Sequence, residues 1–157
     1  MSEVDLSSPP PEEFLAGIEQ FNQGEYYACH DTLEAIWMTA PVFEKPFYQG
    51  ILQSAVALYH LGNHNWRGAA ILLGESLQRL QQYEPEYQGV DVTELVDSGF
   101  AWLEALQTLG PEQVTVIANA VTPGLTPIEI REFDLTLPPL HISLTDHSST
   151  DSSGSQG

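Results

Sequence analysis

The chain of 157 residues is 42% hydrophobic and 10% aromatic, which is typical of one globular domain with a sizeable core. Its 22 Asp and Glu against 4 Lys and Arg give a formal net charge of −18. Such a surface repels phosphate backbones, so we expect no nucleic-acid partner, and anionic membrane surfaces are disfavoured for the same reason. A cation, a small molecule or a basic protein suits this surface better, although solubility alone also explains acidic residues.

Cys29 is the only cysteine, so the chain has no intramolecular disulfide and no cysteine-based zinc knuckle. The thiol lies among apolar residues with no Lys or Arg nearby to lower its pKa, which favours a buried structural role. The N-terminus has no basic segment followed by an apolar run, and no apolar stretch is long enough to span a bilayer. We therefore expect a cytoplasmic protein without membrane insertion.

Helical spacing of apolar residues predicts five main helices after a mobile leader at residues 1–10. Proline, glycine and asparagine separate them, since these residues open, end or interrupt helices. A weaker helix follows the fifth and ends near residue 119. The sequence thus predicts an all-α fold, a compact bundle of about five antiparallel helices that occupies residues 11–120. The expected main helices are at about 11–22, 25–38, 46–62, 65–82 and 92–108.

The sequence changes character beyond Pro123. Apolar residues continue between Pro127, Pro138 and Pro139, and extended spacing fits them better than a helix does. We expect residues 121–144 to form an extended arm laid along the bundle. Residues 145–157 are almost all Ser, Thr, Asp and Gly, which predicts a disordered tail because they bury nothing.

Two polar stripes stand out on the second and third helices. Residues three, four or seven apart share a helix face, so His30, Glu34 and Trp37 lie together with Tyr26. The next helix carries a similar stripe of Gln49, Gln53 and His60. Both helices otherwise look apolar, which places the stripes at or near a buried seam.

A short loop makes these two helices antiparallel neighbours. In such a hairpin His30 should oppose Gln53, and Glu34 should oppose Gln49. This register predicts a cluster of His30, Glu34 and Gln53, which His60 joins only if the helices cross steeply.

Three roles for the cluster remain open. His30 and Glu34 have the i, i+4 spacing of helical metal ligands, and an open divalent site could activate water. Glu34 could instead tune His30 as a general base without a metal. The third role is a satisfied polar network that fixes helix register, because the pair lacks the second histidine of a full zinc motif. Asp31 lies about 100° around the helix from His30, so we interpret it as solvent-facing or as a contact at the hairpin end rather than as a ligand.

An ordered set of motifs resembles the domain of unknown function 309 family, a small all-helical group, over about residues 12–80. The resemblance implies a compact helical bundle with the His/Glu/Gln cluster at its centre, and some descriptions call the family predicted metal-dependent hydrolases. Members commonly have Glu where this chain has Asp31. The matching positions are Phe21-Asn22, Gly24, Tyr26, His30-Asp31, Leu33-Glu34, Trp37, Phe47, Gln49-Gly50-Ile51-Leu52-Gln53, Ala55, His60 and Gly68-Ala69.

Two functional hypotheses follow. In the first, His30 and Glu34 are catalytic residues and metal ligands of a hydrolase-like site, and a divalent metal is the cofactor. Trp37, Gln49, Gln53 and His60 would then line the pocket. In the second, the chain is a non-catalytic helical adaptor with an exposed apolar patch for a protein partner. A homo-oligomer is compatible with both hypotheses.

Overall fold

The computed structural model describes residues 11–145, and the predicted leader and most of the predicted tail lie outside this range. Within it the chain is mainly helical, which confirms the all-α compact fold. The α-helices are α2 (Glu12–Asn22), α3 (Tyr26–Thr39), α4 (Lys45–Gly62), α5 (Trp66–Leu80), α6 (Val92–Leu109) and α7 (Val114–Ala120). Short 3-10 turns are η1 (Gln81–Tyr83), η2 (Pro111–Gln113) and η3 (Arg131–Phe133), and the strands are β1 (Glu86–Tyr87), β2 (Val90–Asp91), β3 (Ile128–Ile130) and β4 (Leu135–Leu137).

Local chemistry explains where the helices begin and end. Glu12 and Glu13 lie in the first turn of α2, where carboxylates stabilise the helix dipole. Gly24 has φ of 82°, the left-handed conformation that separates α2 from α3 at little cost. The side chain of Asn65 accepts a hydrogen bond from Gly68 N at 2.9 Å and caps α5. Asp91 caps α6 in the same way, with Glu94 N as the donor.

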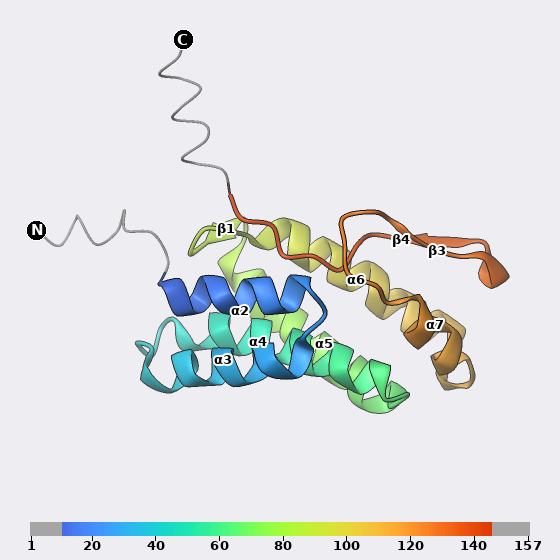
Figure 1. The fold of residues 1–157 in the computed structure, drawn as a ribbon, viewed down its shortest axis with the longest axis horizontal. Coiled ribbons are helices and arrows are strands. Elements are labelled where there is room, and N and C mark those ends of the chain that lie inside the picture. Colours follow the sequence, from blue (N-terminus) through green and yellow to red (C-terminus); the bar gives the residue numbers. More distant parts are fainter. Residues whose placement is uncertain (1–10, 146–157) are drawn as a thin grey trace, which may run out of the picture.

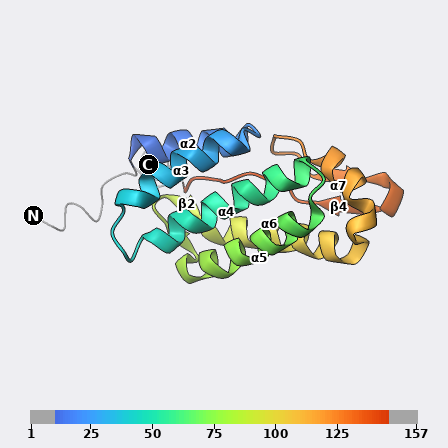
Figure 2. The ribbon, with the colours of Figure 1, turned by 90° about the horizontal axis from the view of Figure 1, so that it is seen from below.

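Helix α4 is the central element of the bundle. It packs against α3 on one side and α5 on the other, while α2 packs on α3 and α6 packs on α5 (Figures 1 and 2). Ten of its residues are buried, whereas α3 buries only Cys29 and Leu33. The core therefore lies around α4, and α3 is an outer helix.

The seam between α4 and α5 is packed very closely. A Cβ atom at Gly50 would lie 2.8 Å from Leu80 Cγ, so only glycine fits there without a shift. Buried hydroxyls join the two helices: Ser76 Oγ donates to Gly50 O at 2.7 Å and lies 2.6 Å from Ser54 Oγ. Small residues and satisfied hydrogen bonds thus hold this seam together.

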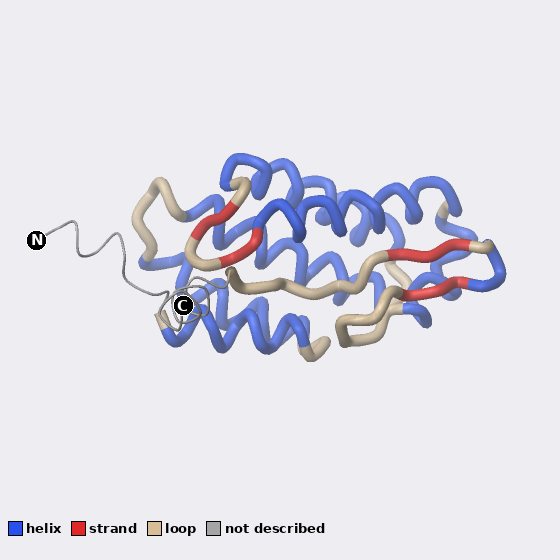
Figure 3. The backbone as a smooth tube through the Cα atoms, turned by 90° about the horizontal axis from the view of Figure 1, so that it is seen from above, coloured by secondary structure: helices blue, strands red, loops and turns tan. Residues whose placement is uncertain are grey.

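The segment after α7 is more structured than the plain arm that the sequence predicted. Strands β3 and β4 form an antiparallel hairpin that pairs Ile128 with Leu137 and Ile130 with Leu135. Asp134 has φ of 52°, which lets the chain turn tightly between the strands. The extended arm begins only after the hairpin, at Pro138, and runs back along the bundle (Figure 3).

Candidate functional site

The site that the sequence singled out lies on the exposed side of α3. The inner face of this helix presents Cys29 and Leu33 to the core, and His30 and Glu34 follow them around the helix. The side chains of His30 and Glu34 are 26% and 53% exposed. The α3 stripe is therefore more exposed than predicted, because α3 covers the bundle from outside and only one of its faces is enclosed, whereas Gln53 of the α4 stripe is buried.

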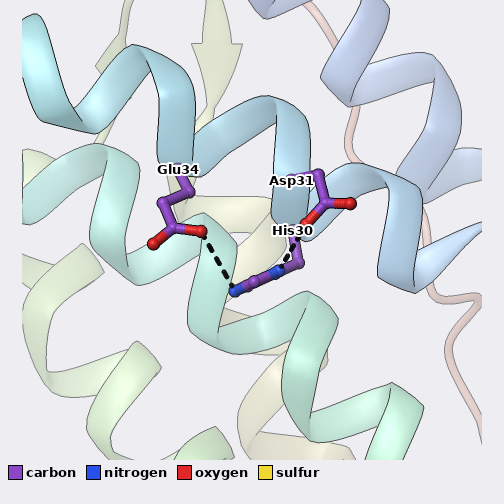
Figure 4. Close-up of side chains that lie close together, drawn as sticks. All are labelled: His30, Asp31 and Glu34. Atoms are coloured by element: carbon purple, nitrogen blue, oxygen red, sulfur yellow. Dashed lines mark hydrogen bonds and ion pairs between the residues drawn. The ribbon is translucent and has the colours of Figure 1, made fainter.

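The imidazole ring of His30 lies between two carboxylates (Figure 4). Its Nδ1 atom is 3.2 Å from Asp31 Oδ1, and its Nε2 atom is 3.8 Å from Glu34 Oε1. One ligand atom from each of the three residues lies within 4.8 Å of the other two. This is one nitrogen donor with two oxygen donors on successive turns of a single helix.

The sequence predicted the exposure of Asp31 but not its contact with His30. Its side chain is 65% exposed, as expected for a solvent-facing position. Its carboxylate nevertheless bends back to His30, which the angle of about 100° between neighbouring helix positions argued against. A short acidic side chain directly after a histidine is the sequence signal that the angular argument overlooked.

Two tyrosines beside His30 were also missed. The ring of Tyr27 stacks on the His30 ring at 5.7 Å between centroids, and Tyr59 of α4 lies 5.3 Å from Tyr27. Both tyrosines are exposed, at 59% and 42%. The i, i+3 spacing from Tyr27 to His30 was the available signal, since such residues are neighbours on a helix.

Gln53 does not join the His30 cluster, which corrects the predicted register contact. Its Nε2 donates to Glu75 Oε1 at 3.0 Å, and its Oε1 accepts from Arg79 at 3.2 Å, so the buried amide is bonded to α5. The prediction considered only the α3–α4 hairpin, whereas α4 also packs against α5. Gln49, one turn earlier, is half-buried and forms no side-chain hydrogen bond within residues 11–145.

Trp37 and His60, the other predicted pocket residues, lie in different surroundings. Lys45 Nζ lies 4.3 Å from the centre of the Trp37 ring, a cation–π geometry, and the indole nitrogen is buried without a partner in the described chain. His60 lies at the end of α4, where Asn65 Nδ2 donates to its Nδ1 at 3.3 Å. This contact belongs to the α4–α5 turn, so His60 does not bond to His30.

Ionisable groups on the inner side of α3 are held neutral. Burial raises the pKa of the Cys29 thiol to about 12. Burial, with a smaller effect of Cys29, also raises the pKa of Tyr26 to about 12. Neither residue is therefore a nucleophile at neutral pH, and Cys29 has the structural role that its neighbours predicted.

A surface hollow lies on another side of α3. A groove of about 360 Å³ runs between the start of α2 and α3, and none of its lining residues belongs to the His30 group. Positions 32, 35, 36 and 39 face away from position 30 on the helix. The groove is therefore separate from the solvent-accessible His30 group. The groove is lined by Pro11, Glu13, Thr32, Ala35, Ile36 and Thr39.

Sequence comparison matches residues 14–72 to the family described as a domain of unknown function, number 309. These residues belong to that family. The match runs from α2 into α5 and includes the His30 group, Gln49, Gln53 and His60, as the resemblance implied.

A relative in Bacillus subtilis (strain 168), named "Uncharacterized protein YpuF", is 33% identical over 110 residues. The alignment covers 69% of this chain but only 60% of that protein. None of the helices in the described part of the chain combines the length and apolar character needed to cross a membrane.

Proposed function

We propose that His30 and Glu34 bind a divalent transition-metal ion on the exposed side of α3, and that Asp31 orients the imidazole. The position of the ring between two carboxylates is the observation that supports this function. The Nδ1 atom is within hydrogen-bond reach of Asp31 at 3.2 Å. The Nε2 atom is 3.8 Å from Glu34, too far for a hydrogen bond but less than two metal–ligand bonds of about 2.1 Å each.

The donor set favours particular ions. An imidazole with carboxylates suits zinc, manganese or iron, whereas calcium and magnesium prefer oxygen alone. A carboxylate on the second ring nitrogen is the usual partner of a metal-bound histidine, because it fixes the tautomer and the ring orientation. Asp31 fills that position here, so we assign it a positioning role.

The reaction class that fits such a site is metal-assisted hydrolysis. A bound divalent ion would supply Lewis acidity and lower the pKa of a water ligand. His30 and Glu34 leave other coordination positions open because both are solvent-accessible. Tyr27 and Tyr59 provide an aromatic wall beside His30, against which an apolar part of a substrate would pack.

Metal titration of tag-free, chelator-treated protein by calorimetry tests the proposal. We expect one saturable site for zinc or manganese, lost in His30→Ala and Glu34→Gln, and weakened about 10- to 100-fold in Asp31→Asn. His64→Ala and Glu104→Gln change exposed residues elsewhere and should leave the site intact. Equal losses in these controls would mean that the acidic surface attracts cations without a site, and the proposal would be abandoned.

Hydrolysis is tested after binding, with chromogenic phosphate and carboxylate esters. We expect turnover that requires the added metal and disappears in His30→Ala. Metal binding without any turnover would retain the metal site and remove the hydrolase function.

A non-catalytic interaction protein is the second candidate, and exposed apolar side chains favour it. Met38, Val42 and Phe43 are 64%, 81% and 71% exposed at the end of the α3–α4 hairpin. Tyr83 donates a hydrogen bond to Phe43 O at 2.8 Å, so the backbone that presents them is held in place. The His30 contacts lie within α3 and do not fix its register against α4, which leaves them free for either function.

The double variant Val42→Ser/Phe43→Ser separates the two candidates. An interaction protein should lose its co-purifying partner in this variant and keep it in His30→Ala. The metal proposal predicts the reverse pattern for metal affinity.

A further inference from the structure

The arm that starts at Pro138 lies between α2, α6 and the β1–β2 hairpin, where it contacts Asn22, Trp102 and Val90. We call the surface that the arm covers the groove. The arm runs back from β4 along α6 and ends beside β1 and β2 (Figures 1 and 3). Leu144 forms an isolated antiparallel bridge with Val90 of β2, which joins the end of the arm to the hairpin. The chain thus carries an extended segment docked across elements that are distant in sequence.

Most of the hydrogen bonds that hold the arm go to its backbone. Ile142 N donates to Asn22 Oδ1 at 2.7 Å, and Asn22 Nδ2 donates to Ile142 O at 3.0 Å. Trp102 Nε1 donates to Pro138 O at 2.8 Å. Further along, Asp91 N donates to Ser143 O at 2.9 Å. Backbone bonding of this kind is how proteins bind extended peptides by strand addition.

Alternate side chains of the arm supply the apolar contacts. Leu140 and Ile142 are 7% and 1% exposed, while His141 between them is half-buried. Burial alternates over these three residues, as in an extended peptide with one buried face, and it ends there because Leu144 is 48% exposed. Side-chain pockets for alternate residues are also what gives strand addition its specificity.

Leu140 does not fill the groove completely. A cavity of about 20 Å³ remains beside it, bounded on the bundle side mainly by apolar residues of α2, α4, α5 and α6. Its lining includes Phe21, Leu58, Leu77, Leu95 and Gly99. The groove therefore accepts a side chain somewhat larger than leucine at this position.

We propose that this groove is a peptide-binding site, and that the arm of a second copy of the chain can replace the chain's own arm in it. The arm sequence is the one that the groove fits. Residues 135–145 contain no Asp or Glu, although the chain as a whole has a formal charge of −18. A second copy thus offers an apolar segment without acidic residues, which an acidic surface does not repel.

Residues 122–127 form a connection at which the chain can change direction and carry the arm to a second copy. They are all exposed, and no backbone hydrogen bond joins any of them to another described residue. Redirection therefore breaks no ladder or helix bond in this connection, although it moves the β3–β4 hairpin together with the arm and detaches that hairpin from α6 and α7. Net repulsion between two acidic copies opposes the exchange of arms. Arm exchange should therefore increase with salt concentration, because salt screens that repulsion.

Complementation between two full-length variants tests the proposal. Ile142→Asp puts a charge in the arm and empties an intact groove, whereas Asn22→Leu removes both groove bonds to Ile142 and leaves an intact arm. Each variant alone should be a monomer near 17.3 kDa by light scattering. Their mixture should give a heterodimer of twice that mass, because the arm of the second variant occupies the groove of the first.

A matched control replaces Asn22→Leu by Gln23→Ala. Gln23 neighbours Asn22, but its side chain bonds to Glu19 of α2 and not to the arm, so the arm of this variant stays docked and no heterodimer should form. A mixture that stays monomeric while both variants keep the wild-type helical circular dichroism would overturn the proposal.

A peptide assay covers the case in which Ile142→Asp does not fold. A fluorescent peptide of residues 135–145 is then titrated into the milder full-length variant Ile142→Ala. Saturable binding that is lost when Asn22→Leu is added supports exchange, and a peptide with Phe at position 140 should bind more tightly. Absence of saturable binding overturns the proposal.

Discussion

Two regions of the molecule carry residues of the same family segment: the seam between α4 and α5, and the outer face of α3. These residues are buried in the seam and exposed on α3. In the seam, Gly50 admits Leu80 and buried Gln53 bonds to two charged side chains of α5. On α3, the side chains of His30, Asp31 and Glu34 face solvent, and within residues 11–145 their polar contacts are with one another. The difference shows that a polar residue in a shared motif gains its role from its burial and its partners.

The position of each helix in the bundle produces this difference. α4 is enclosed by neighbours on two sides, so a polar group that faces these neighbours, such as Gln53, needs a partner inside the protein. α3 covers the bundle from outside and can present charged groups to water at little cost. Replacement of seam residues should therefore change stability, whereas replacement of His30 should change binding.

The largest expected effect is that of Gly50→Val. The first added atom would lie 2.8 Å from Leu80 Cγ and 3.4 Å from Ser76 O, so the helices must separate. Overpacking of this kind should lower the free energy of unfolding by about 3 kcal/mol in urea denaturation. Gly62→Ala is the matched control in the same helix, since nothing lies within 4 Å of its Cβ position. Equal stability of the two variants would show that the seam is not closely packed.

Gln53→Ala should have the next largest effect. It removes hydrogen bonds to Glu75 and Arg79 from a side chain that is only 8% exposed. We expect a loss of about 2 kcal/mol, because bonds to charged groups contribute more than neutral ones. Gln49→Ala, one turn away and without a side-chain bond in residues 11–145, should cost clearly less. If both changes cost the same, the Gln53 contacts contribute nothing to the seam.

Alkaline pH tests the inner face of α3 directly beside the site. Burial raises the pKa of Cys29 from 9.0 to about 12, so the folded state keeps the thiol neutral while the unfolded state ionises. The stability contributed by this neutral thiol is complete below pH 9 and is lost as the pH rises toward 12. When the pH is raised from 8 to 10, the free energy of unfolding should fall by about 1 kcal/mol more in the wild type than in Cys29→Ala. Parallel pH curves would mean that the thiol ionises in the folded protein.

The helices were predictable because local rules determine them. Pro11 and the first-turn carboxylates of α2, Gly24 and the capping Asn65 act within a few residues of each helix end. The apolar spacing that marks α4 and α5 also needs no knowledge of the tertiary structure. The β3–β4 hairpin was missed because Asp134, an ordinary residue in a left-handed conformation, gives a weaker turn signal than glycine.

Within the candidate site, the sequence predicted that His30 and Glu34 lie close together, but it did not predict the contacts of Asp31, Tyr27 or Gln53. Helical spacing correctly joined His30 and Glu34, since both lie on one helix. The position of Gln53 depended on which of two neighbouring helices α4 turns it toward, and spacing within one hairpin carries no such information. Asn22 shows the same limit, because its partner Ile142 lies 120 positions away along the chain.

His30→Ala should have the smallest effect on the metal-free protein. Its contacts are exposed ion pairs within one helix, which contribute little to folding, so we expect a change within about 0.5 kcal/mol. A metal at ten times its dissociation constant should stabilise the wild type by about 1.4 kcal/mol and leave the variant unchanged. Thermal or urea unfolding with and without zinc measures both quantities.

A loss of 2 kcal/mol or more in metal-free His30→Ala would contradict the comparison. A stability loss of that size is typical of a buried hydrogen bond to a charged group. It would mean that His30, like Gln53, holds the helices together. A variant that is as stable as the wild type but unresponsive to zinc would instead show that the α4–α5 seam determines stability and the outer face of α3 determines metal binding. The outer face of α3 would then be a surface whose sequence is free of folding constraints and available for binding.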